Sequence, residues 1–233
     1  MTKRIRIAIL DDHQGIIDGY LYRLGQVDDI DVTATASFGE EVEPILAQKA
    51  VDVLILDVYV PTSPENPNPY PILHLVPRLL AQYPKMEILV VTMHAQRTLI
   101  QALMEAGVSG FVLKDDQATI HELASVIRTV AKGGIYLSPF AYQQLMKHPA
   151  GELNQPLSAR QSQALSLCAA YPDANTADLA EMMKIAQSTL RNLLSGSYLK
   201  LNVRTRSAAV AKARLMGLIS PEIPAINLNE NQS

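Results

Sequence analysis

Carboxylate, hydroxyl and ammonium side chains stand at the ends of four short apolar runs, and together these groups could carry out phosphoryl transfer. The residues are Asp11, Asp12, Asp57, Thr92 and Lys114. An aspartate can attack phosphorus and form an aspartyl-phosphate, while a lysine and a hydroxyl can stabilise the phosphate oxygens. Three neighbouring carboxylates repel one another unless a cation neutralises them, and carboxylate oxygens suit Mg²⁺. Asp11, Asp12 and Asp57 are therefore candidate magnesium ligands.

These residues come together if the apolar runs are strands of one parallel sheet. We predict strands at 5–10, 31–36, 51–56, 87–91 and 110–113, alternating with helices at 15–24, 40–48, 71–82, 97–106 and 120–131. This alternation is typical of a doubly wound α/β domain with helices on both faces of the sheet. Such sheets bind ligands at the carboxyl ends of their strands. Each of these polar residues alone is more often a turn or surface residue. The prediction of a phosphoryl-transfer site therefore depends on their shared position at the carboxyl ends of the strands.

The sequence around these strand ends resembles the receiver domain of two-component response regulators of the NarL/FixJ type. The resemblance covers residues 4 to about 137 and rests on Asp11-Asp12-His13, Leu56-Asp57 with Pro61 four residues later, Val91-Thr92-Met93-His94-Ala95 and Gly110-Phe111-Val112-Leu113-Lys114. It implies a CheY/flavodoxin-like fold in which a sensor histidine kinase phosphorylates Asp57, with Mg²⁺ held by Asp11, Asp12 and Asp57. It also implies that Phe111 is a switch aromatic that turns inward when Thr92 moves toward the phosphate. An ordinary core position explains Phe111 equally well.

Two features depart from the receiver pattern. Tyr59 stands two residues after Asp57, where the family usually has a smaller polar residue, and its ring would crowd the path of attacking water. We therefore expect an altered aspartyl-phosphate lifetime. Residues 62–71 form a longer loop than usual, with four prolines after Ser63. This loop is either a tolerated surface insertion or a surface for an auxiliary regulator; RcsB-like members of the family also extend it.

The second half of the chain has the opposite charge balance. Residues 1–137 contain 11 Lys and Arg against 17 Asp and Glu, whereas residues 157–219 contain 8 against 3. An acidic N-terminal part and a basic C-terminal part predict two domains with different binding partners. We place the α/β domain at 1–137, a linker at 138–156 that includes a short helix at 139–146, a basic domain at 157–220 and a disordered tail at 221–233.

The basic module resembles the LuxR-type helix-turn-helix domain. Helices are predicted at 159–170, 176–183, 187–199 and 206–216, and the matching motifs are Leu157-Ser-Ala-Arg160, Ser188-Thr-Leu-Arg191, Lys200-Leu201-x-Val203, Arg206-Ser-Ala-Ala-Val210 and Gly217-Leu218-Ile219. The resemblance implies an all-α domain whose third helix enters the major groove of double-stranded DNA. The candidate DNA contacts are Arg191, Asn192 and Ser195 on that helix and Lys200, Arg204 and Arg206 on phosphates.

Several departures from the helix-turn-helix pattern leave the base contacts open. Gln161 replaces a usual glutamate, Ala186 replaces the usual capping Ser or Thr, Leu193 replaces a common histidine, and Gly196 lies in mid-helix. Ser158 is the expected N-cap of the first helix. These changes leave the predicted fold in place, because the order and spacing of the motifs are kept.

The composition of the chain disfavours a disulfide-rich protein and a membrane protein. The chain has a net charge of −3 and one cysteine, Cys168, which we expect to be a small buried residue. No stretch approaches the ~20 apolar residues of a membrane span, so we expect a cytoplasmic protein that does not associate with membranes.

The leading interpretation is a phosphorylation-controlled transcription factor, not an enzyme, that forms a homodimer when active. Alternatives are a DNA-binding regulator controlled by a partner protein, an adaptor that no longer binds DNA, and a haloacid-dehalogenase-like phosphatase. The phosphatase would need Asp-x-Asp after the first strand, whereas Asp57 follows the third.

Overall fold

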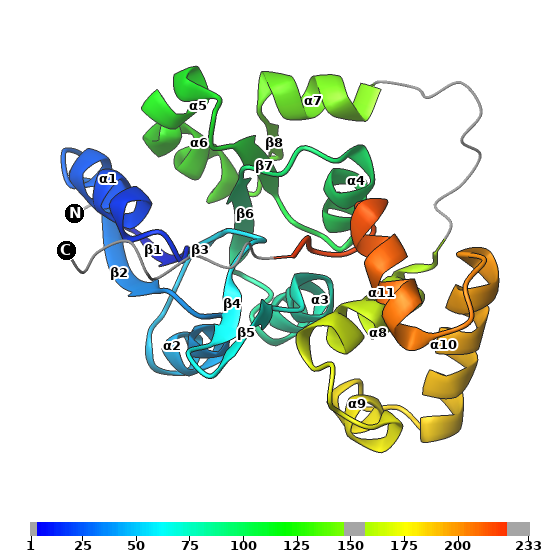
Figure 1. The fold of residues 1–233 in the computed structure, drawn as a ribbon. Helices are drawn as coiled ribbons and strands as arrows, with labels where there is room; N and C mark the ends of the chain where they lie inside the picture. Colours follow the sequence, from blue (N-terminus) through cyan, green and yellow to red (C-terminus); the bar gives the residue numbers. More distant parts are fainter. Residues whose placement is uncertain (1–3, 147–156, 223–233) are drawn as a thin grey trace, which may run out of the picture.

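A six-stranded parallel sheet forms the centre of the first half of the computed structural model, which describes residues 4–146 and 157–222 (Figure 1). The strand order is β2-β1-β3-β6-β7-β8. The strands are β1 (Ile5–Leu10), β2 (Ile30–Ala36), β3 (Val53–Leu56), β6 (Glu87–Thr92), β7 (Gly110–Leu113) and β8 (Tyr136–Leu137). All five pairings are parallel, which confirms the doubly wound α/β class.

Helices cover both faces of this sheet because side chains alternate between the faces along each strand. Ile7 and Ile9 of β1 pack with α1 (Gln14–Leu24) and α6 (Leu123–Val130). Ala8 and Leu10 face the other way, toward the remaining helices of the α/β part. These are α2 (Val42–Gln48), which follows a 3-10 turn at Gly39–Glu41, α3 (Ile72–Gln82) and α4 (Arg97–Glu105).

Three elements differ from the predicted ones. The helix expected at 120–131 is two helices, α5 (Gln117–His121) and α6, because Glu122 leaves helical geometry at φ −96° and ψ 15°. The short strand β8 was not predicted. The proline-rich loop is an antiparallel hairpin of β4 (Pro61–Ser63) and β5 (Asn66–Pro69), in which the missing N–H groups of proline are tolerated since both strands are edges.

The second half of the chain is helical, as predicted. It contains α8 (Ala159–Ala170), α9 (Thr176–Met182), α10 (Gln187–Lys200) and α11 (Arg206–Leu215), and it follows α7 (Pro139–Met146). The Ser158 hydroxyl accepts the Gln161 amide while the Gln161 side chain accepts the Ser158 amide, so glutamine still completes the capping box. Ala186 provides no side-chain cap to α10.

The buried core is continuous between the two halves, since one cluster of buried residues extends from the sheet through α3 into α8, α10 and α11. Most of the predicted linker, residues 147–156, and most of the predicted tail, residues 223–233, lie outside the described residues. No helix within the described ranges is long and apolar enough to span a membrane.

Candidate functional site

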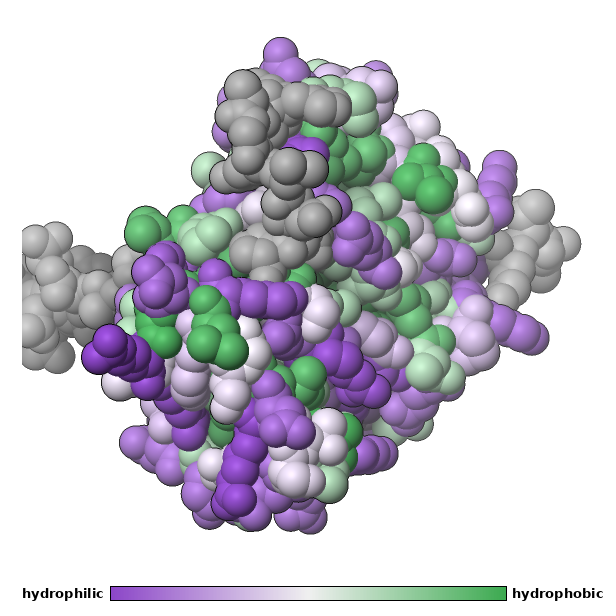
Figure 2. Space-filling model, turned by 90° about the vertical axis from the view of Figure 1, so that its right-hand side faces the viewer, coloured by the Kyte–Doolittle hydropathy of each residue, from purple (hydrophilic) through white to green (hydrophobic). Residues whose placement is uncertain are grey.

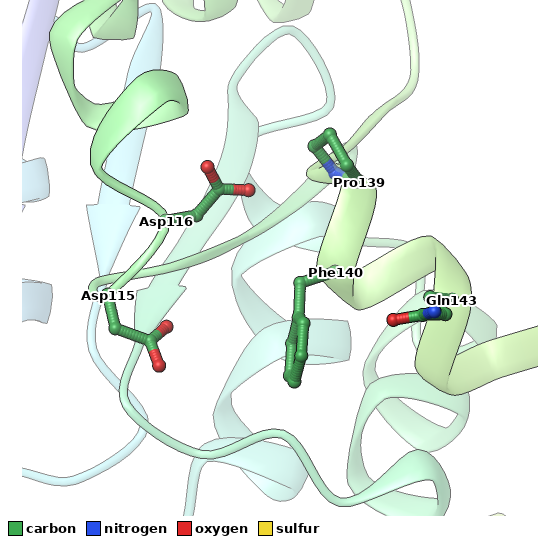
Figure 3. Close-up of a pocket in the computed structure, with 5 residues that line it drawn as sticks. All are labelled: Asp115, Asp116, Pro139, Phe140 and Gln143. Carbon is green, nitrogen blue, oxygen red and sulfur yellow. The ribbon is translucent and has the colours of Figure 1, made fainter.

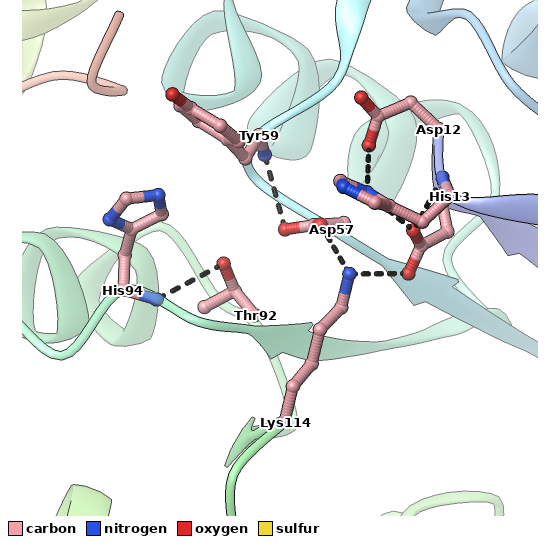
Figure 4. Close-up of polar contacts among 8 residues, drawn as sticks. Asp12, His13, Asp57, Tyr59, Thr92, His94 and Lys114 are labelled. Atoms are coloured by element: carbon pink, nitrogen blue, oxygen red, sulfur yellow. Dashed lines mark hydrogen bonds and ion pairs between the residues drawn. The ribbon is translucent and has the colours of Figure 1, made fainter. Parts of the chain in front are cut away.

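The predicted polar residues meet at one edge of the sheet, where β1, β3, β6 and β7 end (Figure 4). The Lys114 ammonium lies 2.6 Å from a carboxylate oxygen of Asp11 and 2.6 Å from one of Asp57. The second oxygen of Asp57 accepts the backbone N–H of Tyr59 at 3.1 Å. The side chains of Asp11, Asp57 and Lys114 are at most 5% exposed. The Asp57 carboxylate is therefore buried at the sheet edge and is paired with the Lys114 ammonium.

The site has more negative than positive charge. Burial raises the pKa of Asp11 above its ordinary value, although Lys114 acts against this, and burial also raises the pKa of Asp12. Burial alone would lower the pKa of Lys114, but the carboxylates of Asp57 and Asp11 outweigh it and the pKa is raised. A single ammonium faces three carboxylates, and this excess of hard oxygen donors fits a divalent cation such as Mg²⁺.

The ligand positions differ in detail from the predicted set. One oxygen of Asp11, one oxygen of Asp12 and one ring nitrogen of His13 lie within 4.8 Å of one another. That compact group contains His13 rather than Asp57, and the His13 ring already lies 2.8 Å from an Asp12 oxygen. His13 was quoted in the motif but was not predicted as a site residue. The predicted ligand set of Asp11, Asp12 and Asp57 stays a prediction.

Thr92 and Phe111 are both fully buried. The Thr92 hydroxyl accepts the His94 amide at 3.4 Å, so it lies at the same strand edge as Asp57. Phe111 is inside the core on the face of the sheet that α3 and α4 cover. The switch role of Phe111 stays a prediction.

Tyr59 stands at the mouth of this site, as its position after Asp57 predicts. Its ring lies 4.7 Å from the His94 ring, centroid to centroid, with the two planes tilted by 56°. Figure 4 shows the two rings on one side of Asp57. Burial and the charge of Asp12 raise the pKa of the Tyr59 hydroxyl, so the phenol stays protonated at neutral pH.

The family follows from comparison with known proteins. A model described as the response regulator receiver domain matches residues 7–125, slightly more than half of the chain. The chain belongs to the response regulator family. MctR of Rhizobium johnstonii, a transcriptional regulatory protein, is 27% identical over 222 residues that cover 94% of this chain and 99% of that protein.

One further relative and one solved structure are similar to this response regulator. UhpA of Salmonella typhimurium, a transcriptional regulatory protein, is 32% identical over 160 residues, which cover 68% of this chain and 73% of UhpA. The structure of RcsB from Salmonella enterica serovar Typhimurium, bound to the promoter rprA with a phosphomimetic, has a TM-score of 0.62 at 19% identity and covers 90% of this chain and 98% of RcsB. The likeness to RcsB shows a shared fold along both halves of the chain.

The helical half of the response regulator is docked on its receiver. Helix α8 packs against α10 and α11 of the helical domain and also against α3 and β5 of the receiver. The Asn66 side chain on the proline hairpin donates to the carbonyl of Ala170 at 2.9 Å. His74 of α3 is buried in this region, and burial with the nearby Arg78 and Arg160 charges lowers its pKa to about 4. The hairpin therefore contacts the chain's own helical domain.

Most of the candidate DNA contacts lie on an open surface. Arg191, Asn192 and Ser195 on α10 are exposed, as is Arg204. Figure 2 views the molecule from the side of the helical domain and shows mainly hydrophilic side chains with isolated hydrophobic ones between them.

The two other predicted phosphate contacts have internal partners. The Lys200 ammonium donates to the Gln161 side chain at 3.0 Å. The Arg206 guanidinium donates to the carbonyls of Ala174 and Tyr171 at 2.6 and 2.7 Å. Arg206 thus ties the α8–α9 turn to α11, and phosphate contacts by Lys200 and Arg206 stay predictions.

A separate hollow of about 510 Å³ lies between the turn after Lys114 and α7 (Figure 3). Asp115 and Asp116 line one side, and Phe140 and Gln143 of α7 line the other. The Asp116 side chain also caps α5 by accepting the Thr119 amide. Asp57, Asp11 and Asp12 do not line this hollow.

Proposed function

We propose that this response regulator is a transcription factor that a sensor histidine kinase switches by phosphorylating Asp57. The phosphorylated chain then binds double-stranded DNA through α10 as a homodimer. The observation that carries the proposal is the contact of one buried ammonium, Lys114, with both Asp11 and Asp57 at the carboxyl edge of the sheet. The chain acts as a phosphoryl acceptor rather than as an enzyme with a small-molecule substrate of its own.

The transfer chemistry uses the residues at the strand ends. An oxygen of Asp57 forms a bond to phosphorus, the phosphorus–nitrogen bond to the kinase histidine breaks, and the electron pair stays on that nitrogen. Lys114 stabilises the charge on the phosphate oxygens, and the Thr92 hydroxyl is near enough to the strand edge to donate to one of them. Asp11, Asp12 and Asp57 would hold Mg²⁺, which supplies further neutralisation of the phosphate charge.

The DNA-binding part of the proposal rests on charge and exposure. The helical domain has an excess of basic residues, and Arg191, Asn192 and Ser195 lie exposed on one helix. An exposed helix of this kind fits the major groove. Full-length relatives such as MctR are transcriptional regulators, which favours DNA binding over an adaptor role.

Replacing Arg191 by alanine is expected to weaken binding to a specific site by about tenfold to a hundredfold, because a bidentate contact to guanine contributes about 1–3 kcal/mol. The probe is a duplex selected from a random-sequence pool by the phosphorylated wild-type chain, and affinity is measured by fluorescence anisotropy over a range of salt concentrations. Arg4→Ala, at an exposed arginine before β1, is the control. Binding that is absent, or that does not fall with salt, would favour the adaptor alternative.

Replacing Tyr59 by asparagine is expected to shorten the lifetime of the aspartyl-phosphate several-fold. The Tyr59 ring lies against His94 at the mouth of the site, and its removal opens a path for water. Loss of the phosphoryl group is followed by intact mass after the phosphodonor has been removed. Tyr22→Asn, at a tyrosine that is 74% exposed on α1, is the control. A lifetime equal to that of the wild type would show that the ring does not limit hydrolysis.

A further inference from the structure

The segment that follows α11, residues 216–222, runs back from the helical domain to the receiver. In Figure 1 it is the red segment that leads from α11 toward the strands. We call this segment the strap. Leu218, Ile219 and Ser220 are each at most 3% exposed, so the strap is packed against the protein and is not a free end. Hydrogen bonds join the strap to the receiver at Thr98 of α4 and at Tyr59.

The first contact fixes the start of the strap to α4. The Thr98 hydroxyl lies 2.7 Å from the carbonyl oxygen of Met216 and 3.0 Å from that of Gly217. Gly217 has a φ of +65°, and a Cβ there would lie 2.7 Å from the Cβ of Gln96. Glycine thus both ends α11 and allows the backbone of the strap to approach the first turn of α4.

The second contact places the end of the strap at the mouth of the site. The Tyr59 hydroxyl donates to the carbonyl of Glu222, and Arg214 of α11 lies 3.5 Å from the Glu222 carboxylate. Tyr59 also donates its backbone N–H to Asp57, and its ring lies against His94. One residue therefore touches the phospho-acceptor with its backbone and holds the strap with its side chain.

The closed strap leaves polar groups without partners. Among the described residues, the buried side-chain atoms that lack a hydrogen bond are Nε of Arg214 and Oγ of Ser220. Both residues belong to the strap or to the helix that leads into it. Buried polar atoms of this kind cost free energy and regain hydrogen bonds when water reaches them. Release of the strap would give both atoms access to water.

We propose that the strap restricts access to Asp57, and that phosphorylation of Asp57 and release of the strap are coupled. The proposal rests on the function proposed above. Coupling between two equilibria is reciprocal. Loosening the strap therefore speeds phosphorylation, and a phosphoryl group on Asp57, acting through Tyr59, loosens the strap. The helical domain then regulates its own activation by covering the acceptor, independently of any contact made by α10.

The test compares full-length wild type with Thr98→Val, which removes the hydroxyl that holds Met216 and Gly217. The initial rate of phosphorylation by subsaturating acetyl phosphate with Mg²⁺ is followed by intact mass. We expect the variant to react about twofold to tenfold faster, which is the effect of losing one hydrogen bond. Thr129→Val is the matched control, because the Thr129 hydroxyl also donates to a backbone carbonyl, that of Ser125, on α6.

Hydrogen exchange in residues 216–222 gives the second measurement. Exchange is expected to rise in Thr98→Val without phosphodonor, and in wild type after phosphorylation. Tyr59→Phe, which loses the hydroxyl contact to Glu222 but keeps the ring, serves if Thr98→Val does not fold. Equal phosphorylation rates in wild type and Thr98→Val, with unchanged hydrogen exchange in residues 216–222, would overturn the proposed role of the strap. The proposed function would be unaffected by that result. A wild-type chain that acetyl phosphate does not modify would overturn the proposed function and this inference with it.

Discussion

Replacing Lys114 by methionine is expected to lower the free energy of unfolding by about 3 kcal/mol, because removal of one partner leaves buried charges uncompensated. Lys114 lies 2.6 Å from both Asp11 and Asp57, and all three side chains are buried. Methionine keeps most of the volume of the lysine chain, so the loss reflects charge rather than packing. Urea denaturation at neutral pH measures the change.

The same denaturation experiment with added Mg²⁺ provides a second comparison. A divalent cation that binds the folded Asp11, Asp12 and Asp57 group stabilises the folded state by mass action, so added Mg²⁺ is expected to recover part of the stability lost in Lys114→Met. Lys85→Met, at an exposed lysine after α3, is the control and is expected to be close to wild type. Equal stabilities of the two variants would contradict the electrostatic account of the site.

Replacing Asp57 by asparagine is expected to reduce phosphorylation to background, since an amide oxygen is a poor nucleophile toward phosphorus. Asparagine keeps the shape of the side chain and can still accept the Tyr59 amide. Intact mass after treatment with acetyl phosphate and Mg²⁺ measures the added phosphoryl group. Asp173→Asn, at an exposed aspartate of the helical domain, is the control. Equal mass increases in Asp57→Asn and wild type would show that another residue is the phosphoryl acceptor.

The receiver core and the meeting of its polar residues could be predicted from sequence for a simple physical reason. Parallel strands buried on both faces are continuous apolar runs, and their carboxyl ends share one edge of the sheet. The observed bounds of β7, Gly110–Leu113, are those predicted, and Lys114 lies beside Asp11 and Asp57 as that geometry requires.

The proline hairpin and the docking of the two halves could not be predicted from the same patterns. Proline interrupts strand periodicity, so residues 61–69 read as a loop, although β4 and β5 pair there. The position of α8 does have a signal in its sequence. Arg160 is the only charged residue of that helix, and a helix with so few charges is expected to be covered on several sides.

The sequence motifs also could not predict side-chain contacts with residues that are far away in the chain. Arg206 is expected to contact DNA phosphates, and it also donates to two carbonyls of the turn after α8, which the motifs do not indicate. Tyr59 was expected only to crowd the acceptor, but its hydroxyl also reaches Glu222. Both contacts join residues that are far apart in the chain, and local spacing carries no information about them.

The most direct test of the central claim is a DNA titration with wild type and Asp57→Asn, each with and without acetyl phosphate and Mg²⁺. The probe is the duplex selected by the phosphorylated wild-type chain, at one fixed salt concentration. We predict that the phosphodonor raises the affinity of the wild type and leaves that of Asp57→Asn unchanged. Equal affinity of the wild type with and without the phosphodonor, in a sample whose phosphorylation is verified by mass, would contradict control of DNA binding by Asp57.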